Sequence, residues 1–500
     1  MPAIPAGAEI AVVGAGTMGA GIARVAAAAG HRVSLYDTRE GAAARAIDAI
    51  RTDLDRQVER GKVTRGDAEA LLDRLHAALH LDVMGRAKLA IEAIVEDRAA
   101  KIALFRELEQ LVADDAILAT NTSSISVNAI GGALKHPARC VGMHFFNPAH
   151  LMPLVEVVAP LTASEEAIET VMATARAWGK RPIRVTSSPG FVVNRVARPY
   201  YAEALRTRSE FFSGVAEIDA AMTESGGFRM GPFRLMDMIG NDVNYAVTRS
   251  VFEAFAYDRR FAPSLLQEEL VDAGRLGRKT GRGYYDYGHA AVDPHAAEAV
   301  PGPPPRAVVA YGDLGVAAPL IALARARGIA VDERASEDPR IEVEGVTLKL
   351  TDGALATEHD RVRPTVLFDL ALDYERCPRI VIAAGIDDAQ ARSAVAAGFF
   401  QALGKRVTPI GDIPGLIVMR TVAAIANEAS TMLGGALGDE TIDLAMTLGV
   451  SYPLGPLAWG ARIGLPHVLA VLENLCRLLG PDRYRPAYVL RMRALAATQR

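Results

Sequence analysis

Short apolar runs alternate with helix-patterned segments at the start of the chain. Glu9–Val13 is an apolar run, Thr17–Ala29 has the periodicity of an apolar helix, and His31–Tyr36 is a second apolar run. A strand, a helix and a strand within about thirty residues form a βαβ unit, whose strands are parallel and whose crossover is right-handed. The pattern therefore predicts an α/β domain at the N-terminus.

A charge-rich, helix-prone stretch at 40–80 follows and is interrupted at Arg60–Lys62, which predicts an inserted helical hairpin. Further strands are expected at Leu89–Val95, Ile117–Ala119, Cys140–Met143, Leu154–Val158 and Ile183–Val185. The first three of these carry a polar residue at or just past the C-terminal end. Because the carboxyl ends of parallel strands share one edge of a sheet, these polar residues are expected to meet in a crevice.

Helical patterning prevails from Ser188 to about Phe261. Ser188 suits an N-cap and Pro189 suits the first helical turn. A Gly- and Arg-rich loop follows at Gly274–Tyr287, and the stretch VPGPPP at Val300–Pro305 predicts an extended linker.

The second half of the chain repeats landmarks of the first in the same order. The pairs are Gly179–Arg181 with Gly404–Arg406, Pro189–Phe191 with Pro414–Leu416, Ile218–Met222 with Ile442–Met446, and Gly231–Phe233 with Gly455–Leu457. Ordered recurrence of this kind predicts a duplicated helical domain. The residues between the two copies have the pattern of a shortened α/β domain.

The pattern as a whole predicts an α/β Rossmann domain followed by an all-α domain, then a shortened Rossmann-like domain and a second all-α domain. The expected boundaries are 1–187 for the first domain with its hairpin at 40–80, 188–290 for the first helical domain, 291–306 for a Pro-rich linker, 307–412 for the degenerate Rossmann-like domain and 413–500 for the second helical domain.

Composition narrows the class of protein. The 500 residues are half hydrophobic and carry a net charge of only -4, which gives no basic footprint for nucleic acid. The apolar runs are too short to span a membrane, and no secretory signal pattern opens the chain. The cysteines Cys140, Cys377 and Cys476 lack metal-ligand spacing. We expect a soluble, cytoplasmic protein with reduced thiols and no metal, nucleic-acid or membrane partner.

The residues Gly14-Ala15-Gly16-Thr17-Met18-Gly19 form a GxGxxG motif between the first expected strand and helix. In this context the first glycine permits a tight turn, the second lets the backbone approach a pyrophosphate, and the third lets helix and strand pack closely. Asp37 would bind ribose hydroxyls and favours NAD over NADP, whereas the nearby Arg39 leaves NADP open. A glycine-rich turn in a domain that binds no nucleotide is the alternative interpretation.

Glu96, Ser123 and His144 lie at or just beyond the ends of expected strands. Taken singly, Ser123 is more typical of a turn residue, and His144 could equally be a core histidine. Glu156 changes this weighing, because it lies within the apolar stretch LMPLVEVVA, where a carboxylate is costly without a partner. A His–Glu pair would supply a base near neutral pH, oriented by a carboxylate.

With these residues the sequence resembles the L-3-hydroxyacyl-CoA dehydrogenase family. The matching strings are GAGTMGAGIA, YD, IEAIVED, NTSS, GMHFFNP, LVEV, PGFVVNR and GRKTGRGYYDY, in order over residues 9–287. The duplicated half resembles longer bacterial members with tandem helical domains, including those that act on 3-hydroxybutyryl-CoA and 3-hydroxyadipyl-CoA. The resemblance implies NAD-dependent oxidation of (S)-3-hydroxyacyl-CoA to 3-oxoacyl-CoA, in catabolism of the β-oxidation or phenylacetate type.

The resemblance also implies roles for matching positions. His144 would be the general base, Glu156 its orienting partner, Ser123 a contact of the substrate hydroxyl and Asn194 a contact of the substrate carbonyl. Lys62 in the hairpin would meet the CoA tail. The implied NAD-binding residues are Gly14, Gly16, Thr17, Met18, Gly19, Asp37, Glu96, Lys101, Ser123 and Asn147.

The second half departs from this pattern. Met419 stands where Asn194 would recur, and Ala307–Asp313 is followed by Leu-Gly-Val where a GxGxxG would be needed. His359 and His467 both lack a glutamate at the spacing that separates the residues of the expected pair. We expect one active site per chain, with the second copy packing against the first or replacing a dimer contact. The chain would then be a monomer or a homodimer.

Two other functions fit parts of the pattern. A dehydrogenase of the 3-hydroxyacid or 6-phosphogluconate type shares the glycine loop and the helical domains, but it relies on a catalytic lysine, whereas this chain presents His144 and Asn194. A non-catalytic, nucleotide-binding structural protein would share the fold. The joint presence of Ser123, His144, Glu156 and Asn194 argues against it.

Overall fold

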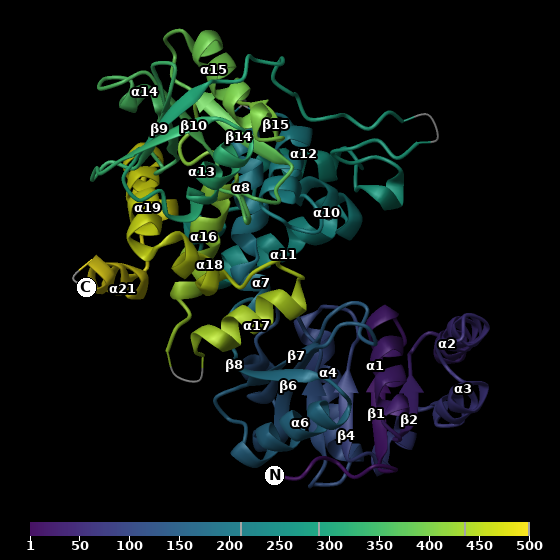
Figure 1. The fold of residues 1–500 in the computed structure, drawn as a ribbon. Helices are drawn as coiled ribbons and strands as arrows, with labels where there is room; N and C mark the ends of the chain where they lie inside the picture. The colour runs from purple at the N-terminus through teal and green to yellow at the C-terminus, as the bar shows by residue number, and fades with distance from the viewer. Residues whose placement is uncertain (211–212, 289–290, 435–436, 499–500) are drawn as a thin grey trace. The chain divides into compact units, whose positions relative to one another are not determined.

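The fold is shown in Figure 1 as a computed structural model that describes residues 1–210, 213–288, 291–434 and 437–498. The chain forms two compact units. The first combines Met1–Arg195 with Gly434–Val450, and the second combines Val196–Leu433 with Ser451–Arg500. A segment of the second helical repeat, with helix α17 (Asp439–Gly449), therefore belongs to the N-terminal unit. The sequence pattern does not predict this exchange.

An eight-stranded sheet forms the centre of the first unit, in the order β3-β2-β1-β4-β5-β6-β7-β8. The strands are β1 (Glu9–Val13), β2 (Arg32–Tyr36), β3 (Leu75–Ala77), β4 (Leu89–Glu92), β5 (Ile117–Thr120), β6 (Cys140–Phe145), β7 (Leu154–Ala159) and β8 (Arg181–Thr186). Strand β7 is antiparallel to β6, whereas the other neighbouring pairs are parallel. The predicted α/β Rossmann domain is confirmed, with β3 as an additional edge strand.

Helices cover both faces of this sheet, as the buried apolar runs of its parallel strands require. One core joins the sheet to α1 (Thr17–Ala28) and α6 (Glu165–Ala177). The other joins it to α4 (Arg98–Leu111) and α5 (Val127–Gly131). The sheet that carries the glycine turn is therefore held by packed helices on both faces.

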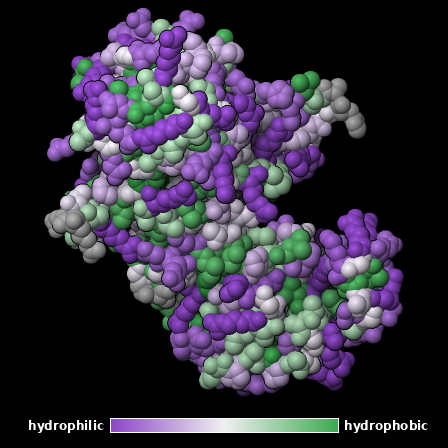
Figure 2. All heavy atoms as spheres, in the orientation of Figure 1, coloured by the Kyte–Doolittle hydropathy of each residue, from purple (hydrophilic) through white to green (hydrophobic). Residues whose placement is uncertain are grey.

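The expected helical hairpin consists of α2 (Ala42–Glu59) and α3 (Arg65–Leu72). Hydrophilic residues prevail on its face in Figure 2, whereas Ile47, Ile50 and Leu54 are buried against the domain. Arg24 of α1 also forms an ion pair with Asp53 of α2, with an N–O distance of 2.6 Å. The hairpin is therefore attached to the domain by apolar packing and by an ion pair.

The helix after β8 begins later than the sequence predicts. Gly190 and Phe191 have φ angles of 71° and 48°, which lie in the left-handed region, so these residues form a turn. Helix α7 (Val193–Val196) starts only after that turn. The expected N-cap at Ser188 is therefore wrong, although Asn194 still lies on the first turn of the helix.

The first helical repeat consists of α8 (Arg198–Ser209), α9 (Val215–Ala220), the π-helical turn η3 (Ala221–Ser225), α10 (Pro232–Ile239), α11 (Asn241–Ala254) and α12 (Leu265–Asp272). The second repeat contributes α16 (Val418–Ser430), α18 (Pro456–Ile463), α19 (Leu465–Leu479), α20 (Pro481–Tyr484) and α21 (Tyr488–Thr498) to the second unit. Helices α8 and α16 are equivalent in the two repeats and pack against each other.

A reduced α/β layer completes the second unit, with a seven-stranded sheet in the order β10-β9-β11-β12-β13-β14-β15. The strands are β9 (Ala307–Tyr311), β10 (Ala330–Arg334), β11 (Arg340–Val343), β12 (Val346–Leu350), β13 (Thr365–Phe368), β14 (Arg379–Ala384) and β15 (Arg406–Pro409), with helices α13 (Pro319–Ala326), α14 (Ala356–His359) and α15 (Ala389–Ala402). Strands β13, β14 and β15 repeat the antiparallel and parallel pairing of β6, β7 and β8. The predicted shortened Rossmann-like domain is confirmed.

None of the helices in the described ranges is both long enough and apolar enough to cross a lipid bilayer.

Candidate active site

The glycine turn between β1 and α1 has the geometry of a dinucleotide cradle. Gly14 has a φ of 104°, and a Cβ at this position would lie 2.4 Å from the carbonyl oxygen of Ala93. A Cβ at Gly19 would lie 1.7 Å from the Gly14 carbonyl oxygen, so both positions exclude any larger residue. At Gly16, by contrast, no described atom lies within 4 Å of such a Cβ. The open space at Gly16 fits a phosphate that approaches the backbone at the start of α1.

Asp37 closes the turn from the end of β2. Its carboxylate accepts a hydrogen bond from the backbone N–H of Ala15 at 2.8 Å and forms two hydrogen bonds with the Arg39 guanidinium at 3.0 Å. These hydrogen bonds, led by that from Arg39, lower the pKa of Asp37 to about 2. The carboxylate is therefore ionised at neutral pH and is placed beside the glycine turn, where a ribose would lie.

A buried ionic network lies at the C-terminal end of β4. Lys101 is only 1% exposed, and its ammonium donates to Glu92 at 2.6 Å and pairs with Glu96 at 3.2 Å. Glu92 is fully buried and also accepts from the Thr120 hydroxyl at 2.7 Å. The sequence analysis missed Glu92, although the same signal that identified Glu156 was present: a carboxylate inside an apolar strand.

Glu96 holds the turn that carries Ser123. Its carboxylate accepts from the backbone N–H groups of Ser123 and Ser124, both at 3.0 Å, and from the Thr122 hydroxyl at 2.5 Å. Burial raises the pKa of Glu96, but the charge of Lys101 and the hydroxyl hydrogen bonds outweigh burial and keep the pKa below its ordinary value. Glu96 therefore lies four residues past β4 and organises the predicted Ser123 turn, with Lys101 behind it.

His144 and Glu156 form a buried hydrogen-bonded pair. The imidazole Nδ1 lies 2.7 Å from Glu156 Oε2, and the two residues are 5% and 0% exposed. They are direct register partners across the antiparallel strands β6 and β7. His144 lies within β6, not beyond its end as the sequence predicted, because β6 continues to Phe145. The rings of Phe146 and Phe191 flank the imidazole at centroid distances of 4.7 and 5.6 Å.

The second carboxylate oxygen of Glu156 is held by the start of the next helix. Oε1 accepts from the backbone N–H groups of Val192 and Val193 at 2.9 and 3.0 Å. Because the first N–H groups of a helix have no intrahelical acceptor, this carboxylate satisfies them and gains the favourable end of the helix dipole. Asn194 directly follows Val193 and is half-buried on the same turn.

A groove runs along α1 between the hairpin and the residues that follow β6. One part, of about 530 Å³, is lined by Gly16, Thr17 and the predicted Asn147 together with Arg24 and Arg45. The adjoining part, of about 710 Å³, shares Arg24 and His150 with the first and extends along α3 to Lys180. Lys62 is exposed at the hairpin turn, next to the lining residue Val63.

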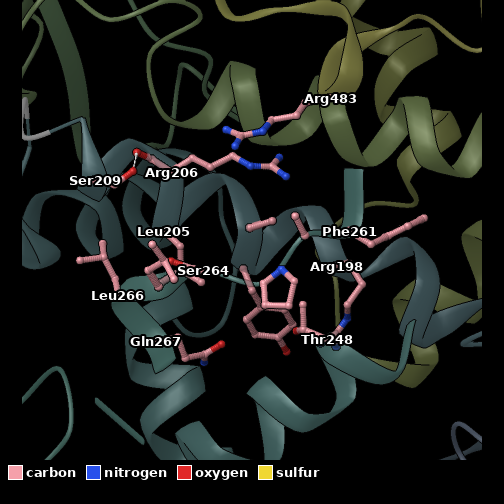
Figure 3. A pocket seen from close by; sticks show the side chains of 15 residues that line it. Arg198, Leu205, Arg206, Ser209, Thr248, Phe261, Ser264, Leu266, Gln267 and Arg483 are labelled. Carbon is pink, nitrogen blue, oxygen red and sulfur yellow. Dashed lines mark hydrogen bonds between the residues drawn. The ribbon is translucent and has the colours of Figure 1, made fainter. Parts of the chain in front are cut away.

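The second unit contains a cavity of about 360 Å³ between α8, the segment before α12 and Arg483 (Figure 3). Arg206 and Arg483 lie on one side of it, and the buried Gln267 lies on the opposite side. The residues that the sequence predicts for the active site are not among its lining residues. This cavity is therefore separate from the predicted site.

In the second half, other residues stand at the positions that correspond to His144 and Glu156. Asp369 and Val381 precede Gly404 at the same spacings at which His144 and Glu156 precede Gly179. The buried Asp369 carboxylate accepts directly from the N–H groups of Ile417, Val418 and Met419, at the start of α16. One carboxylate here replaces the imidazole and binds the helix N-terminus itself.

Among the described residues, no cluster of three or more His, Cys, Asp or Glu side chains could hold a metal ion. Burial raises the pKa of the Cys140 thiol to about 12 and of the Cys377 thiol to about 11. These two thiols are therefore protonated at neutral pH, as in unreactive core positions.

Models of three domain families match the chain in sequence order. They are described as the 3-hydroxyacyl-CoA dehydrogenase NAD binding domain at 9–188, the C-terminal domain of the same family at 190–287 and 415–499, and the 3-hydroxybutyryl-CoA dehydrogenase reduced Rossmann-fold domain at 348–414. The double match of the C-terminal domain confirms the predicted duplication.

Individual relatives agree with these models. The chain is 44% identical over 489 residues to a 3-hydroxyadipyl-CoA dehydrogenase of Escherichia coli K12, covering 97% of each chain. A 3-hydroxybutyryl-CoA dehydrogenase of Mycobacterium tuberculosis H37Rv is 39% identical and matches 56% of this chain and 98% of its own length. The crystal structure of a 3-hydroxybutyryl-CoA dehydrogenase from E. coli K12 superposes with a TM-score of 0.89 at 43% identity, covering 98% of this chain and 99% of that chain.

The glycine turn fits the NAD that the first domain family binds, and the family matches extend through both halves of the chain. The protein therefore belongs to the 3-hydroxyacyl-CoA dehydrogenase family and is an NAD-dependent oxidoreductase.

Proposed function

We propose that the chain oxidises (S)-3-hydroxyacyl-CoA to 3-oxoacyl-CoA with His144 as the general base and Glu156 as the residue that orients it. The observation that carries this proposal is the 2.7 Å contact between His144 Nδ1 and Glu156 Oε2. A carboxylate accepts but does not donate, so Nδ1 bears the proton in the neutral imidazole. Nε2 then has the lone pair that a base needs.

The acid–base step follows from this tautomer. Nε2 of His144 takes the proton from the 3-hydroxyl as the C3–O bond becomes a carbonyl. Glu156 stabilises the imidazolium that forms, and its own position is fixed by the amides of Val192 and Val193. Because protein groups alone make those hydrogen bonds, the fold itself holds the pair in position for the reaction.

Two further residues would align the substrate. Ser123, on the turn held by Glu96, would donate to or accept from the 3-hydroxyl, and Asn194 would donate to the thioester carbonyl. Gly14, Gly16, Thr17, Met18, Gly19 and Asp37 would hold NAD, with Asn147 beside them. Bound NAD supplies the hydride acceptor, and the chain supplies position and proton transfer.

The groove along α1 supports a site for the CoA part of the substrate. Two cationic lining residues already have partners: Arg24 pairs with Asp53, and Lys180 donates to backbone carbonyl oxygens. The exposed cationic side chains are those of Arg45, which lines the groove, and of Lys62, at the hairpin turn beside it. Cationic side chains of this kind suit phosphate groups. Lys101, by contrast, is buried behind Glu96, so we assign it a positioning role and not a contact with NAD.

We further propose one active site per chain. The second half has Asp369 where His144 lies in the first half, Val381 in place of Glu156 and Met419 in place of Asn194. Asp369 is committed to three backbone amides and offers no imidazole for proton transfer. A monomeric or homodimeric state, a cytoplasmic location and a role in β-oxidation or phenylacetate-type catabolism remain predictions.

The test is a spectrophotometric assay of the full-length chain that follows NADH. Acetoacetyl-CoA reduction and a panel of 3-hydroxyacyl-CoA thioesters, including the butyryl and adipyl compounds named for the relatives, would be compared. Oxidation of at least one 3-hydroxyacyl-CoA with NAD, faster than with free 3-hydroxy acids, is the expected result. Turnover of free 3-hydroxy acids alone would favour the 3-hydroxyacid dehydrogenase alternative, and binding of NAD without any turnover would favour the structural one.

A further inference from the structure

Helix α17 comes from the second helical repeat but packs on strand β7 of the first unit. Its last residue, Gly449, lies at the contact. A Cβ at position 449 would come within 2.8 Å of Leu154 Cδ2 and within 3.0 Å of Val193 Cγ2. The first distance is shorter than real Cβ contacts and the second is tighter than most of them, so any larger residue at position 449 would require Leu154 or Val193 to shift.

Both side chains that Gly449 faces are connected to the Glu156 carboxylate. Leu154 lies two residues before Glu156 on β7 and points to the same face of the sheet. The backbone N–H of Val193 donates to Glu156 Oε1 at 3.0 Å. Since protein interiors are closely packed, a displacement of Leu154 or Val193 moves the strand or the amide that sets the position of the carboxylate.

The same exchange occurs in the other half of the duplication. Ile218 recurs as Ile442, so Ser225, seven residues later, corresponds to Gly449. Ser225 ends η3, which packs on β14, and its hydroxyl donates to the Arg379 carbonyl oxygen at 2.8 Å. Arg379 precedes Gly404 by the same spacing at which Leu154 precedes Gly179. Each helical repeat therefore gives the equivalent helix to the sheet of the opposite half.

The two contacts differ in the carboxylate to which each is connected. The contact at Gly449 is connected to Glu156, which pairs with His144. In the half that contains Ser225, the corresponding carboxylate is that of Asp369, which binds a helix N-terminus directly. A perturbation at Gly449 thus reaches a group that we assign to catalysis, and a perturbation at Ser225 reaches a group that is structural. The chain itself provides a matched control.

We propose that α17 is a positioning element of the active site, and that Gly449 is the positioning residue through which the second repeat sets the geometry of Glu156 and of the His144 imidazole. The inference rests on the proposed function, because the proposed function assigns the catalytic role to the His–Glu pair. In this arrangement the non-catalytic repeat completes the site of the catalytic one.

The test substitutes Gly449 with alanine and with valine in the full-length chain. We expect a graded loss of kcat, about 3-fold for Gly449→Ala and about 10-fold or more for Gly449→Val, since small displacements of reacting groups cost large factors in rate. The KM for NAD should stay within about 2-fold, because α17 packs on β7, which three strands separate from the strand β1 that leads into the glycine turn. The acidic limb of the pH–rate profile should also move to lower pH, because a displaced carboxylate stabilises the imidazolium less.

Ser225→Val is the matched control. It crowds the equivalent contact on β14, so it should lower the melting temperature while leaving kcat and the pH profile unchanged. Leu154→Ala in the Gly449→Ala background removes the crowded methyl groups and should return the pH profile toward that of the wild type. A wild-type kcat and pH profile in Gly449→Val, or an equal kinetic loss in Ser225→Val, would overturn the proposal. If Gly449→Val does not fold, the Gly449→Ala and rescue pair decides.

A second readout separates this proposal from the proposed function. The Nδ1 proton of His144, hydrogen-bonded to Glu156, should give a downfield resonance in the NMR spectrum, and this signal does not depend on turnover. Gly449→Val should shift or broaden it, and Ser225→Val should not. If the wild-type chain turned over no acyl-CoA, the function would fail while this measurement still tested α17. An unchanged resonance in Gly449→Val would exclude the positioning role.

Discussion

His144 and Glu156 are register partners across the antiparallel strands β6 and β7, and their side chains meet at 2.7 Å. Residues directly opposite each other in such a pair point to the same face, with Cβ atoms about 4.5–5.5 Å apart. The meeting of the two side chains is thus a consequence of strand pairing, and the loop between them only has to reverse the chain. This geometry is the basis of the first two predictions.

Substitution of the base tests its role directly. His144→Gln keeps a polar side chain but removes the nitrogen that accepts the hydroxyl proton. We expect kcat to fall by about 10² to 10⁴. The NAD dissociation constant, measured by fluorescence titration, should change little, because His144 is not among the residues that line the groove at the glycine turn. A near-normal kcat would exclude His144 as the base.

Glu156→Gln changes the tautomer of the base without changing its shape. The glutamine oxygen would accept from the amides of Val192 and Val193, which leaves its NH₂ group facing Nδ1 of His144. Nδ1 must then accept a hydrogen bond, so the proton moves to Nε2, and the lone pair is lost from the reacting nitrogen. We expect kcat near neutral pH to fall by about 10² to 10⁴, as for analogous changes in catalytic triads. Unchanged steady-state kinetics would contradict the assigned tautomer.

Asp37 determines cofactor affinity in a third prediction. Asp37→Ala removes a carboxylate that faces the glycine turn and also releases Arg39. We expect NAD to bind at least about 10-fold more weakly, a loss typical of a charge-assisted hydrogen bond. Acyl-CoA affinity should be largely retained, as measured by calorimetry with each ligand. An equal loss of both affinities would point to unfolding of the domain.

Asp369 tests the assignment of one active site per chain. Asp369→Asn weakens the three backbone hydrogen bonds at the start of α16, so the melting temperature should fall. Steady-state parameters of the folded variant should match those of the wild type, because the residue contacts no part of the first unit's His–Glu pair. A selective fall in kcat without a loss of stability would mean that the second half takes part in catalysis.

The buried carboxylate Asp219 predicts a pH dependence of stability. Burial raises the pKa of Asp219 to about 6, although the N–H groups of Phe233 and Arg234 and the Tyr285 hydroxyl all donate to it. The folded state therefore holds this proton more tightly than the unfolded chain, whose ordinary pKa is 3.8. Folding takes up a proton between about pH 4 and 6, and stability falls as the pH rises through that range.

Asp219 should contribute at most about 3 kcal/mol to this change, since one pKa unit corresponds to about 1.4 kcal/mol. Urea denaturation of the wild type and Asp219→Asn at several pH values would measure it. The wild type should lose more stability than the variant between pH 4 and 6. Parallel curves would show that other groups are responsible.

Much of the fold could be predicted from local patterns in the sequence. The strand Glu9–Val13 is correct to the residue, and the duplication and the reduced second α/β layer could be recognised from recurring landmarks. The boundaries failed where pairing with distant residues extends or ends a strand, as at β6, which continues through His144 because β7 pairs with it. The late start of α7 depends on the left-handed Phe191, which residue type alone does not indicate.

Residues of the candidate site could be recognised from the sequence where a side chain was chemically unusual for its surroundings. Glu156 stood out because a carboxylate interrupts an apolar strand, and Glu92 could have been found by the same argument. Lys101 was expected at the cofactor, but it is buried between two carboxylates, a contact that depends on how α4 packs. The contact of Gly449 with Leu154 and Val193 is not encoded in any local pattern, because it joins segments that are distant in the chain.

The return of Gly434–Val450 to the first unit also affects how the protein is made. Domains on a ribosome tend to fold in the order in which they emerge. Residues 1–195 emerge early, but their unit lacks α17 until residue 450 has been translated. A chain interrupted before that point would lack the helix that packs on β7, so the first unit is finished only after residues 196–433 of the second unit have been translated.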